Sequence, residues 1–234
     1  MRIFNFDELE STSEYLKNKK DKKEWDLVIA KIQTSGRGRR GNLWVSPPGA
    51  GLFSFALKED PNLSMEEYSK LPLVVGIALL EGLKSVVGLD YKFKWTNDIY
   101  LQDRKLSGIL VEKVEDFFII GIGININNLE FLGRSKNGVS LKKVSGDEYE
   151  ILGVIKKIIN SFEKYWNRYL RGEWNEILCE INQKNYLLNR EIEINFLEDK
   201  IFGIGKRILK NGKLEVETVD GIKEFMVGEI HIKL

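Results

Sequence analysis

Apolar residues follow two different periods along the first part of the chain. Residues 26–33 (DLVIAKIQ) and 51–58 (GLFSFALK) are short apolar stretches bounded by glycine and charged residues, a pattern typical of strands. Residues 64–88 instead carry apolar side chains at helical spacing, and Ser64 with Glu67 forms a capping box at the start of this helix. Pro72 lies inside the helical pattern, so we expect a kink or a break in the helix there.

Four more strands are expected in the middle of the chain, at residues 91–95, 99–102, 105–114 and 117–127. The turns between them are too short for helical crossovers, so neighbouring strands should run antiparallel. Between residues 148 and 187 the apolar spacing becomes helical again and predicts a pair of helices. The expected fold class is therefore α+β, with a mixed, largely antiparallel sheet flanked by helices.

The pattern of apolar and polar residues changes near residue 188. From there the sequence consists of short β runs separated by the dipeptides Glu198-Asp199, Asn211-Gly212 and Asp220-Gly221, which are typical of hairpin turns. We therefore expect a larger domain over residues 1–187 and a small antiparallel barrel or sheet over residues 188–234. A unit this small is not sturdy alone, so it should dock on the larger domain.

Charge and composition narrow the classes of function. The chain of 234 residues has 36 basic and 35 acidic side chains and a formal net charge of +1, so any anion site must be local. The single cysteine, Cys179, excludes an intramolecular disulfide, and with the single histidine, His231, it cannot supply a set of soft zinc ligands. The N-terminus is not a secretory signal, and there is no apolar run of about 18 residues. We expect a cytoplasmic protein with no membrane partner.

The stretch TSGRGRRG, at residues 34–41, is dense in glycine and arginine. Glycine lets backbone N–H groups approach an anion, and arginine binds carboxylate or phosphate through two parallel hydrogen bonds. The stretch follows a strand directly, unlike the RG-rich tails of nucleic-acid-binding proteins, and the Walker A pattern is absent. It is therefore either a solvated connection between strands or a loop that closes over an anion.

Side chains near this loop extend the candidate site. Trp44, just past the loop, is suited to stacking on a purine while arginines contact its phosphates, and it is equally suited to a place in the core. Lys94, Asn97, Asp98 and Lys105 lie close together in KWTNDIYLQDRK. Each alone fits a solvated surface residue, whereas together they fit the binding of a metal-bound polyphosphate.

The order of four motifs resembles the biotin protein ligases: GRGRRG, then W-SP-G-L, then KW-ND-YLQDRKLSGILVE, then GIGININ. The resemblance extends from Glu10 to the end of the chain, because residues 205–230 are similar to the SH3-like C-terminal domain of that family. It implies a class II synthetase-like catalytic domain followed by a small SH3-like β-barrel. Larger members of the family begin with a DNA-binding helix-turn-helix domain, and we expect no such module and no DNA partner here.

The family's reaction has two steps. The carboxylate of biotin attacks the α-phosphate of ATP to give biotinyl-5′-adenylate and pyrophosphate, and a lysine of a biotin carboxyl carrier domain of a carboxylase then attacks the mixed anhydride. Because a carboxylate must approach a triphosphate, positive charge and usually magnesium offset the repulsion. The resemblance therefore implies biotin, ATP with Mg²⁺, and a carrier domain as ligands and partner.

The resemblance also assigns site residues. Biotin binding is implied for Ser11, Thr12, Gln33, Gly36, Arg37, Arg39, Lys105 and Gly108. Nucleotide binding is implied for Arg39, Arg40, Trp44, Asn97, Lys105 and Asn125. The expected catalytic residues are Lys105, Arg39 and Asp98, and Asp98 is also the expected metal contact.

Three positions depart from the family pattern. Thr96 stands where proline is usual, Ser13 stands where asparagine is common, and Asn42-Leu43 replaces a basic residue before the tryptophan. The first change affects only the rigidity of a turn. The last removes one phosphate contact, so the affinity for ATP is less well defined by the resemblance than the type of reaction.

Two other functions stay open. One is a lipoate protein ligase or octanoyl transferase, whose catalytic fold is related, and the other is a non-catalytic nucleotide- or RNA-binding module that uses the arginine loop. The motifs GRGRRG and KLSGILVE favour a biotin ligase over the first. By analogy with the family, the strands near residues 105 to 127 are expected to be exposed, so that a homodimer forms through sheet edges.

Overall fold

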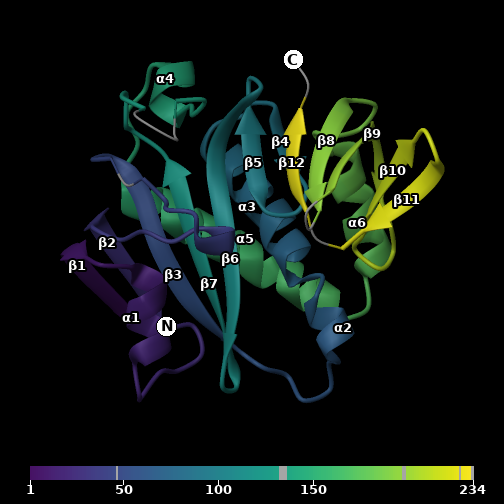
Figure 1. The fold of residues 1–234 in the computed structure, drawn as a ribbon. Helices are drawn as coiled ribbons and strands as arrows, with labels where there is room; N and C mark the ends of the chain where they lie inside the picture. The colour runs from purple at the N-terminus through teal and green to yellow at the C-terminus, as the bar shows by residue number, and fades with distance from the viewer. Residues whose placement is uncertain (46, 132–135, 197–198, 227, 233–234) are drawn as a thin grey trace.

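The computed structural model of the chain describes residues 1–45, 47–131, 136–196, 199–226 and 228–232 and contains two sheets (Figure 1). The larger sheet has seven strands in the order β1-β2-β3-β7-β6-β5-β4. Their bounds are β1 Ile3–Leu9, β2 Leu27–Gln33, β3 Ala50–Lys58, β4 Tyr91–Lys94, β5 Asp98–Leu101, β6 Arg104–Val114 and β7 Phe117–Asn125. β1 and β2 are parallel, and the other neighbouring pairs are antiparallel. The expected mixed, largely antiparallel sheet is confirmed.

Helices cover both faces of this sheet (Figure 1). They are α1 Thr12–Asn18, α2 Met65–Tyr68, α3 Leu71–Val86, α4 Leu141–Ser145, α5 Ile151–Leu170 and α6 Trp174–Gln183. Successive side chains of a strand point to opposite faces, so Leu27 of β2 joins the core under α3 and α5, whereas Val28 packs with Leu16 of α1. In the described ranges, none of the helices is long and apolar enough to span a membrane.

The helix expected over residues 64–88 is divided in two, as the proline predicted. Ser64 and Glu67 form the capping box of α2, with the Ser64 N–H 2.7 Å from Glu67 Oε2 and the Glu67 N–H 3.2 Å from Ser64 Oγ. The second helix, α3, begins at Leu71, so Pro72 occupies its first turn. A proline there removes no helical hydrogen bond. The helical pair expected between residues 148 and 187 is confirmed as α5 and α6.

Strand β1 was not predicted from the apolar pattern. Its seven residues, IFNFDEL, mix apolar and polar side chains, and all seven are exposed or half-buried. The strand pairs in parallel with β2, with Ile3 opposite Leu27. A bidentate ion pair joins the same two segments, because the Arg2 guanidinium donates to both carboxylate oxygens of Asp26. Pairing with a distant segment, rather than local pattern, therefore defines this strand.

The smaller sheet has five antiparallel strands in the order β11-β10-β9-β8-β12. Their bounds are β8 Glu191–Phe196, β9 Asp199–Ile208, β10 Leu214–Thr218, β11 Gly221–Phe225 and β12 Glu229–Ile232. Gly212 and Gly221 have φ angles of 82° and 107°, which glycine adopts readily, so two of the three expected turns are confirmed. Glu198 of the third lies outside the described residues. In the described part of this unit the pairing is that of an open sheet, with no β11–β12 pairing that would close a barrel.

The small sheet packs against the larger unit, as its size predicted. Trp95 of the larger unit donates its indole N–H to the Gly212 carbonyl at 3.0 Å, and Trp174 does the same to Lys210 at 2.7 Å. The side-chain amide of Asn185 donates to the Lys206 carbonyl at 2.7 Å. Apolar residues of both units belong to one core cluster. The domain boundary at residues 187 and 188 stays a prediction.

The expectation that the strands near residues 105 to 127 lie exposed is wrong for β7. This strand is paired with β3 on one side and β6 on the other. β6 pairs with β5 from Arg104 to Gly108, and beyond that point its pairing in the described residues is with β7 alone. Pairing with β3, which is distant in sequence, places β7 in the interior of the sheet. A homodimer through sheet edges stays a prediction.

Candidate functional site

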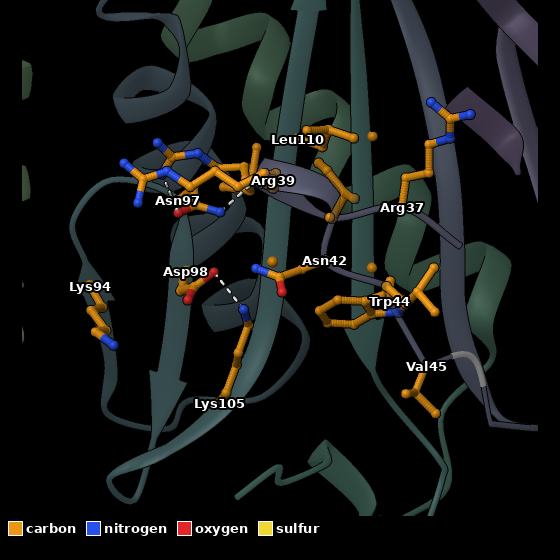
Figure 2. A pocket seen from close by; sticks show the side chains of 18 of the residues that line it. Arg37, Arg39, Asn42, Trp44, Val45, Lys94, Asn97, Asp98, Lys105 and Leu110 are labelled. Atoms are coloured by element: carbon orange, nitrogen blue, oxygen red, sulfur yellow. Dashed lines mark hydrogen bonds and ion pairs between the residues drawn. The ribbon is translucent and has the colours of Figure 1, made fainter. Parts of the chain in front are cut away.

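A pocket of about 400 Å³ opens where the loop after β2 lies across β5, β6 and β7 (Figure 2). Its wall includes all the predicted site residues except Gly36: Ser11, Thr12, Gln33, Arg37, Arg39, Arg40, Trp44, Asn97, Asp98, Lys105, Gly108 and Asn125. Gly36 lies in the loop, where its carbonyl accepts a hydrogen bond from the backbone N–H of Trp44 at 2.8 Å. Residues separated by more than a hundred positions therefore meet in one cavity.

The floor of the pocket is bare strand backbone. Gly108 of β6 lies directly opposite Gly123 of β7, and the Trp44 indole covers both. A Cβ on Gly108 would lie 2.9 Å from the indole, and one on Gly123 would lie closer still. A side chain at either position would therefore force the indole to move. The indole thus packs directly on the backbone of these two glycines. Beside them, Leu110, Gly121 and Ile122 line the apolar slot of the pocket.

Hydroxyl groups line the end of the pocket at α1. Ser11 is the N-cap of this helix, and the next residue donates its backbone N–H to Gln33 Oε1 at 2.8 Å. The Thr12 hydroxyl lies 2.7 Å from Ser54 Oγ, and the Ser13 hydroxyl lies 2.9 Å from the same atom. Ser13, which replaces the family's asparagine, therefore belongs to a buried network of hydroxyls. Ser54 was missed in the sequence because it sits inside an apolar strand with no motif around it.

The arginine-glycine loop, residues 34–45, folds back on itself. The Gly38 N–H donates to the Asn42 carbonyl at 2.7 Å, and Arg37 and Leu43 form an antiparallel bridge. Arg40 has a φ angle of 55° and Gly41 one of 74°, both in the left-handed region. This tight reversal separates the directions of the arginines, so that Arg37 and Arg39 point to different sides of the pocket (Figure 2).

Arg39 is the arginine that reaches the β4–β5 turn. Its guanidinium donates to the Thr96 hydroxyl and, at 2.9 Å, to Asn97 Oδ1. Burial lowers the pKa of Arg39, the charge of Arg40 lowers it further, and Asp98 raises it. Because arginine remains protonated in proteins, a poorly hydrated cation faces the cavity. Thr96 thus has a larger role than the turn rigidity considered from the sequence, since its hydroxyl is an acceptor that proline lacks.

Lys105 and Asp98 form an ion pair across β6 and β5. The Lys105 ammonium lies 2.8 Å from Asp98 Oδ1, and the exposed fractions of the two side chains are 37% and 17%. In Figure 2 this pair lies below Arg39 and to the left of the Trp44 ring. The register of β5 and β6 shifts between Ile99 and Tyr100, just beyond the pair. The contact holds the ammonium in place at the centre of the pocket.

The electrostatic character of the pocket is cationic. Its wall carries Arg37, Arg39, Arg40, Lys94 and Lys105, whereas Asp98 is the one carboxylate among the described lining residues. The described chain also has no group of three or more histidine, cysteine, aspartate or glutamate residues that could hold a metal ion. A metal contact at Asp98 would therefore need ligands that a substrate brings, and it stays a prediction.

The small sheet contributes a part of the wall that was not predicted. Gly228, Ile230 and His231 line the pocket. The Lys94 ammonium donates to the Ile230 carbonyl at 2.7 Å and lies 5.2 Å from the centre of the Tyr100 ring. From the sequence, His231 is only a potential zinc ligand that lacks other soft ligands. His231 is far along the chain from the other site residues, so the sequence does not indicate that it lines the same cavity.

Comparisons with known proteins agree with this geometry. Residues 5–127 match the Biotin/lipoate A/B protein ligase family. The chain is 31% identical over 243 residues to the bifunctional ligase/repressor BirA of Escherichia coli, covering 96% of this chain and 72% of that protein. It is 30% identical over 217 residues to BirA of Bacillus spizizenii, covering 89% of this chain and 66% of that protein.

A solved structure matches along nearly its whole length. The biotin protein ligase from Aquifex aeolicus, in complex with biotin and ATP, superposes with a TM-score of 0.89 at 31% identity. The match covers 99% of this chain and 98% of that one. The chain therefore spans 66% to 72% of the length of the BirA relatives, but nearly all of the Aquifex protein.

Proposed function

The chain belongs to the biotin/lipoate A/B protein ligase family, and we propose that it is a biotin protein ligase. In this proposal it activates biotin with ATP to biotinyl-5′-AMP and transfers biotin to a lysine of a biotin carboxyl carrier domain of a carboxylase. The observation that carries it is one cavity with a hydroxyl-lined apolar slot at one end and cationic side chains at the other. Such a cavity fits a neutral bicyclic head joined by an alkyl chain to a carboxylate.

The slot accommodates the head of biotin. The ureido group has two N–H donors and one carbonyl, which the hydroxyls of Ser11 and Thr12, the Gln33 amide and the backbone near Gly36 and Arg37 can satisfy. The backbone of Gly108, covered in part by Trp44, belongs to the same wall.

The cations then bring two anions together. A carboxylate oxygen of biotin attacks the α-phosphorus of ATP, and the bond from phosphorus to the bridging oxygen breaks as pyrophosphate leaves. Lys105 and Arg39, held by Asp98 and Thr96 respectively, offset the charge that meets at that phosphorus. In the second step the carrier amine attacks the acyl carbon, loses a proton and displaces AMP.

The nucleotide is assigned to the cationic end. Arg40, Asn97 and Asn125 line it, and the indole of Trp44 offers a face for adenine. Mg²⁺ usually binds through phosphates with one or two carboxylates, and Asp98 supplies the one carboxylate among the lining residues that the structure describes, which fits this pattern. When bound with ATP, the ion would neutralise phosphate charge.

Two further parts of the proposal concern location and DNA. A cytoplasmic location is consistent with a chain that has a single cysteine. With a formal net charge of +1, we expect no sequence-specific DNA binding, although the BirA relatives are described as repressors as well as ligases. A gel-shift titration at physiological salt should show only weak, salt-sensitive retardation. Specific retardation at nanomolar protein would contradict this part.

One reaction mixture tests the activity. The protein is incubated with biotin, ATP, Mg²⁺ and a carrier domain, and pyrophosphate release and streptavidin blotting are measured together. Biotin-dependent pyrophosphate and a labelled carrier are expected. Lipoate or octanoate in place of biotin should give neither, and a thermal shift with biotin but not with lipoate is the matching binding measurement. Binding of polyanions without ATP use would instead support a nucleotide- or RNA-binding module.

A further inference from the structure

Four alternating charges run from the arginine-glycine loop to the central sheet. Arg37 Nη1 lies 3.0 Å from Glu14 Oε1. The same Glu14 oxygen lies 2.7 Å from the Lys17 ammonium, which lies 2.6 Å from Glu112 Oε1. These four residues, which we name the charge chain, connect three segments that are distant in sequence: the loop, α1 and β6.

The charge chain is separate from the reacting groups. In Figure 2 the Arg37 side chain points away from Asp98 and Lys105, on the far side of the pocket from Arg39. Its exposed fraction is 53%, whereas that of Glu14 is 26%. The guanidinium of Arg37 therefore faces the first turn of α1, and its charge is offset there by a better-buried carboxylate.

The charge chain nevertheless borders the slot assigned to biotin. Glu14 lies in the first turn of α1, where its backbone N–H donates to the hydroxyl of the N-cap Ser11 at 3.4 Å. Glu112 follows Gly108 and Leu110 at alternate positions of β6, so the three share one face of the strand. The charge chain thus joins α1, which follows the N-cap Ser11, to β6, which carries Gly108 and Leu110.

We propose that Glu14 is a positioning residue that holds Arg37, and with it the arginine-glycine loop, closed against α1. Lys17 and Glu112 orient Glu14 for this contact, because each inner member of the charge chain has two oppositely charged neighbours. Arg39 attaches the opposite side of the loop to the β4–β5 turn. The loop is therefore held at two side chains, and loss of either contact lets the bound ligand leave faster. The effect on ligand release rests on the proposed function.

The substitution Glu14→Gln tests this contact with little other change. It keeps the size of the side chain and the backbone hydrogen bond to Ser11, and it removes the negative charge. Half-exposed ion pairs shift equilibria by about two- to fivefold, so the measurement must report on the loop itself. Glu59→Gln is the matched control, because Glu59 pairs with Lys113 of β6 at 2.6 Å, with exposed fractions of 23% and 39%, far from the loop.

The first measurement is native trypsin cleavage after Arg37, Arg39 and Arg40 without ligand, followed by mass spectrometry. Cleavage of the folded protein reports local opening. Glu14→Gln should be cut about threefold faster than the parent, and Glu59→Gln at the parent rate. At about 0.5 M NaCl, where charges are screened, the parent and Glu14→Gln rates should converge. Equal rates for the parent and Glu14→Gln at low salt would overturn the proposal.

The second measurement is the rate of biotin dissociation, with steady-state kinetics beside it. Glu14→Gln should raise the dissociation rate and the KM for biotin about threefold and leave kcat and the melting temperature unchanged. The double variant Glu14→Gln with Arg37→Gln should be no more impaired than the worse of the two single variants, since both substitutions remove the same contact. A lower kcat with an unchanged KM would overturn the proposal. If the parent binds no biotin, the proposed function fails, while the cleavage measurement still decides whether Glu14 holds the loop.

Discussion

The Arg39 guanidinium donates hydrogen bonds to two consecutive residues of the β4–β5 turn, the Thr96 hydroxyl and Asn97 Oδ1. The first acceptor exists because this chain has threonine where the biotin protein ligases usually have proline. The loop and the turn are thereby joined through two neighbouring side chains.

Loss of the Thr96 acceptor should loosen Arg39. A hydrogen bond to a charged group contributes about 1.5–3 kcal/mol, and Asn97 retains part of the contact, so Thr96→Val should slow adenylate formation by about tenfold. Thr96→Ser keeps the hydroxyl and should stay near the parent rate. Biotin-dependent exchange of pyrophosphate into ATP is the measurement. Equal rates for the two variants would mean that the hydroxyl does not position Arg39.

Replacement of Arg39 itself should release the intermediate. Biotinyl-adenylate is a reactive anhydride, and Arg39→Gly removes up to two charge-assisted hydrogen bonds while making the loop more flexible. We expect the variant to form adenylate more weakly than the parent and to label bystander proteins such as albumin, which a streptavidin blot with an amine quencher detects. An inactive variant would assign Arg39 to the chemistry alone. An active variant that remains selective would show that other residues retain the intermediate.

Lys105 should act mainly in the chemical step. Lys105→Gln removes a preorganised positive charge, which commonly costs about 10² in rate, and it leaves Asp98 without its ion-pair partner. Pyrophosphate exchange should fall by about that factor, and the affinity for biotin should change less. Lys113→Gln is the control, because Lys113 lies on the same strand and pairs with Glu59 instead. Normal exchange in Lys105→Gln would remove this residue from the catalytic set.

The ion pair that fixes β1 should make stability depend on pH. Burial raises the pKa of Asp26, but hydrogen bonds from Arg2 and from the Lys23 N–H outweigh burial and hold the pKa below its usual range. Asp26 therefore contributes its full stabilisation above the pKa of the unfolded chain, about 3.9. This contribution is lost as the pH falls through the lower pKa that Asp26 has in the folded protein. Asp26→Asn should destabilise the protein by about 1–3 kcal/mol at pH 7.

Thermal melting across a pH series checks this prediction. The difference between the parent and Asp26→Asn should shrink as the pH falls below about 4. Asp7→Asn is the control, because Asp7 pairs with Lys31 on the same two strands with both side chains largely exposed. That variant should melt close to the parent. A constant difference for Asp26→Asn at all pH values would contradict the assignment.

Much of the fold follows from short-range pattern. The strands from β2 to β7 and the division of the helix at Pro72 were predictable, because periodicity, capping and proline act over neighbouring residues. The smaller sheet was predicted from its turn dipeptides. β1 was not, since its mixed residues become a strand only by pairing with β2. The interior position of β7 likewise depends on which strands pair, which the pattern of one segment does not contain.

The candidate site divides in the same way. By itself the sequence determined which residue types the site has, because the arginine-glycine loop and the lysine, asparagine and aspartate cluster are each contiguous. Only the tertiary structure decided which of them touch: Arg39 with Thr96, Glu14 with Arg37, and His231 on the same cavity wall. The physical reason is that strand register and the docking of the small sheet place these side chains. Both arise from burial of apolar surface between distant segments, to which a local motif contributes little.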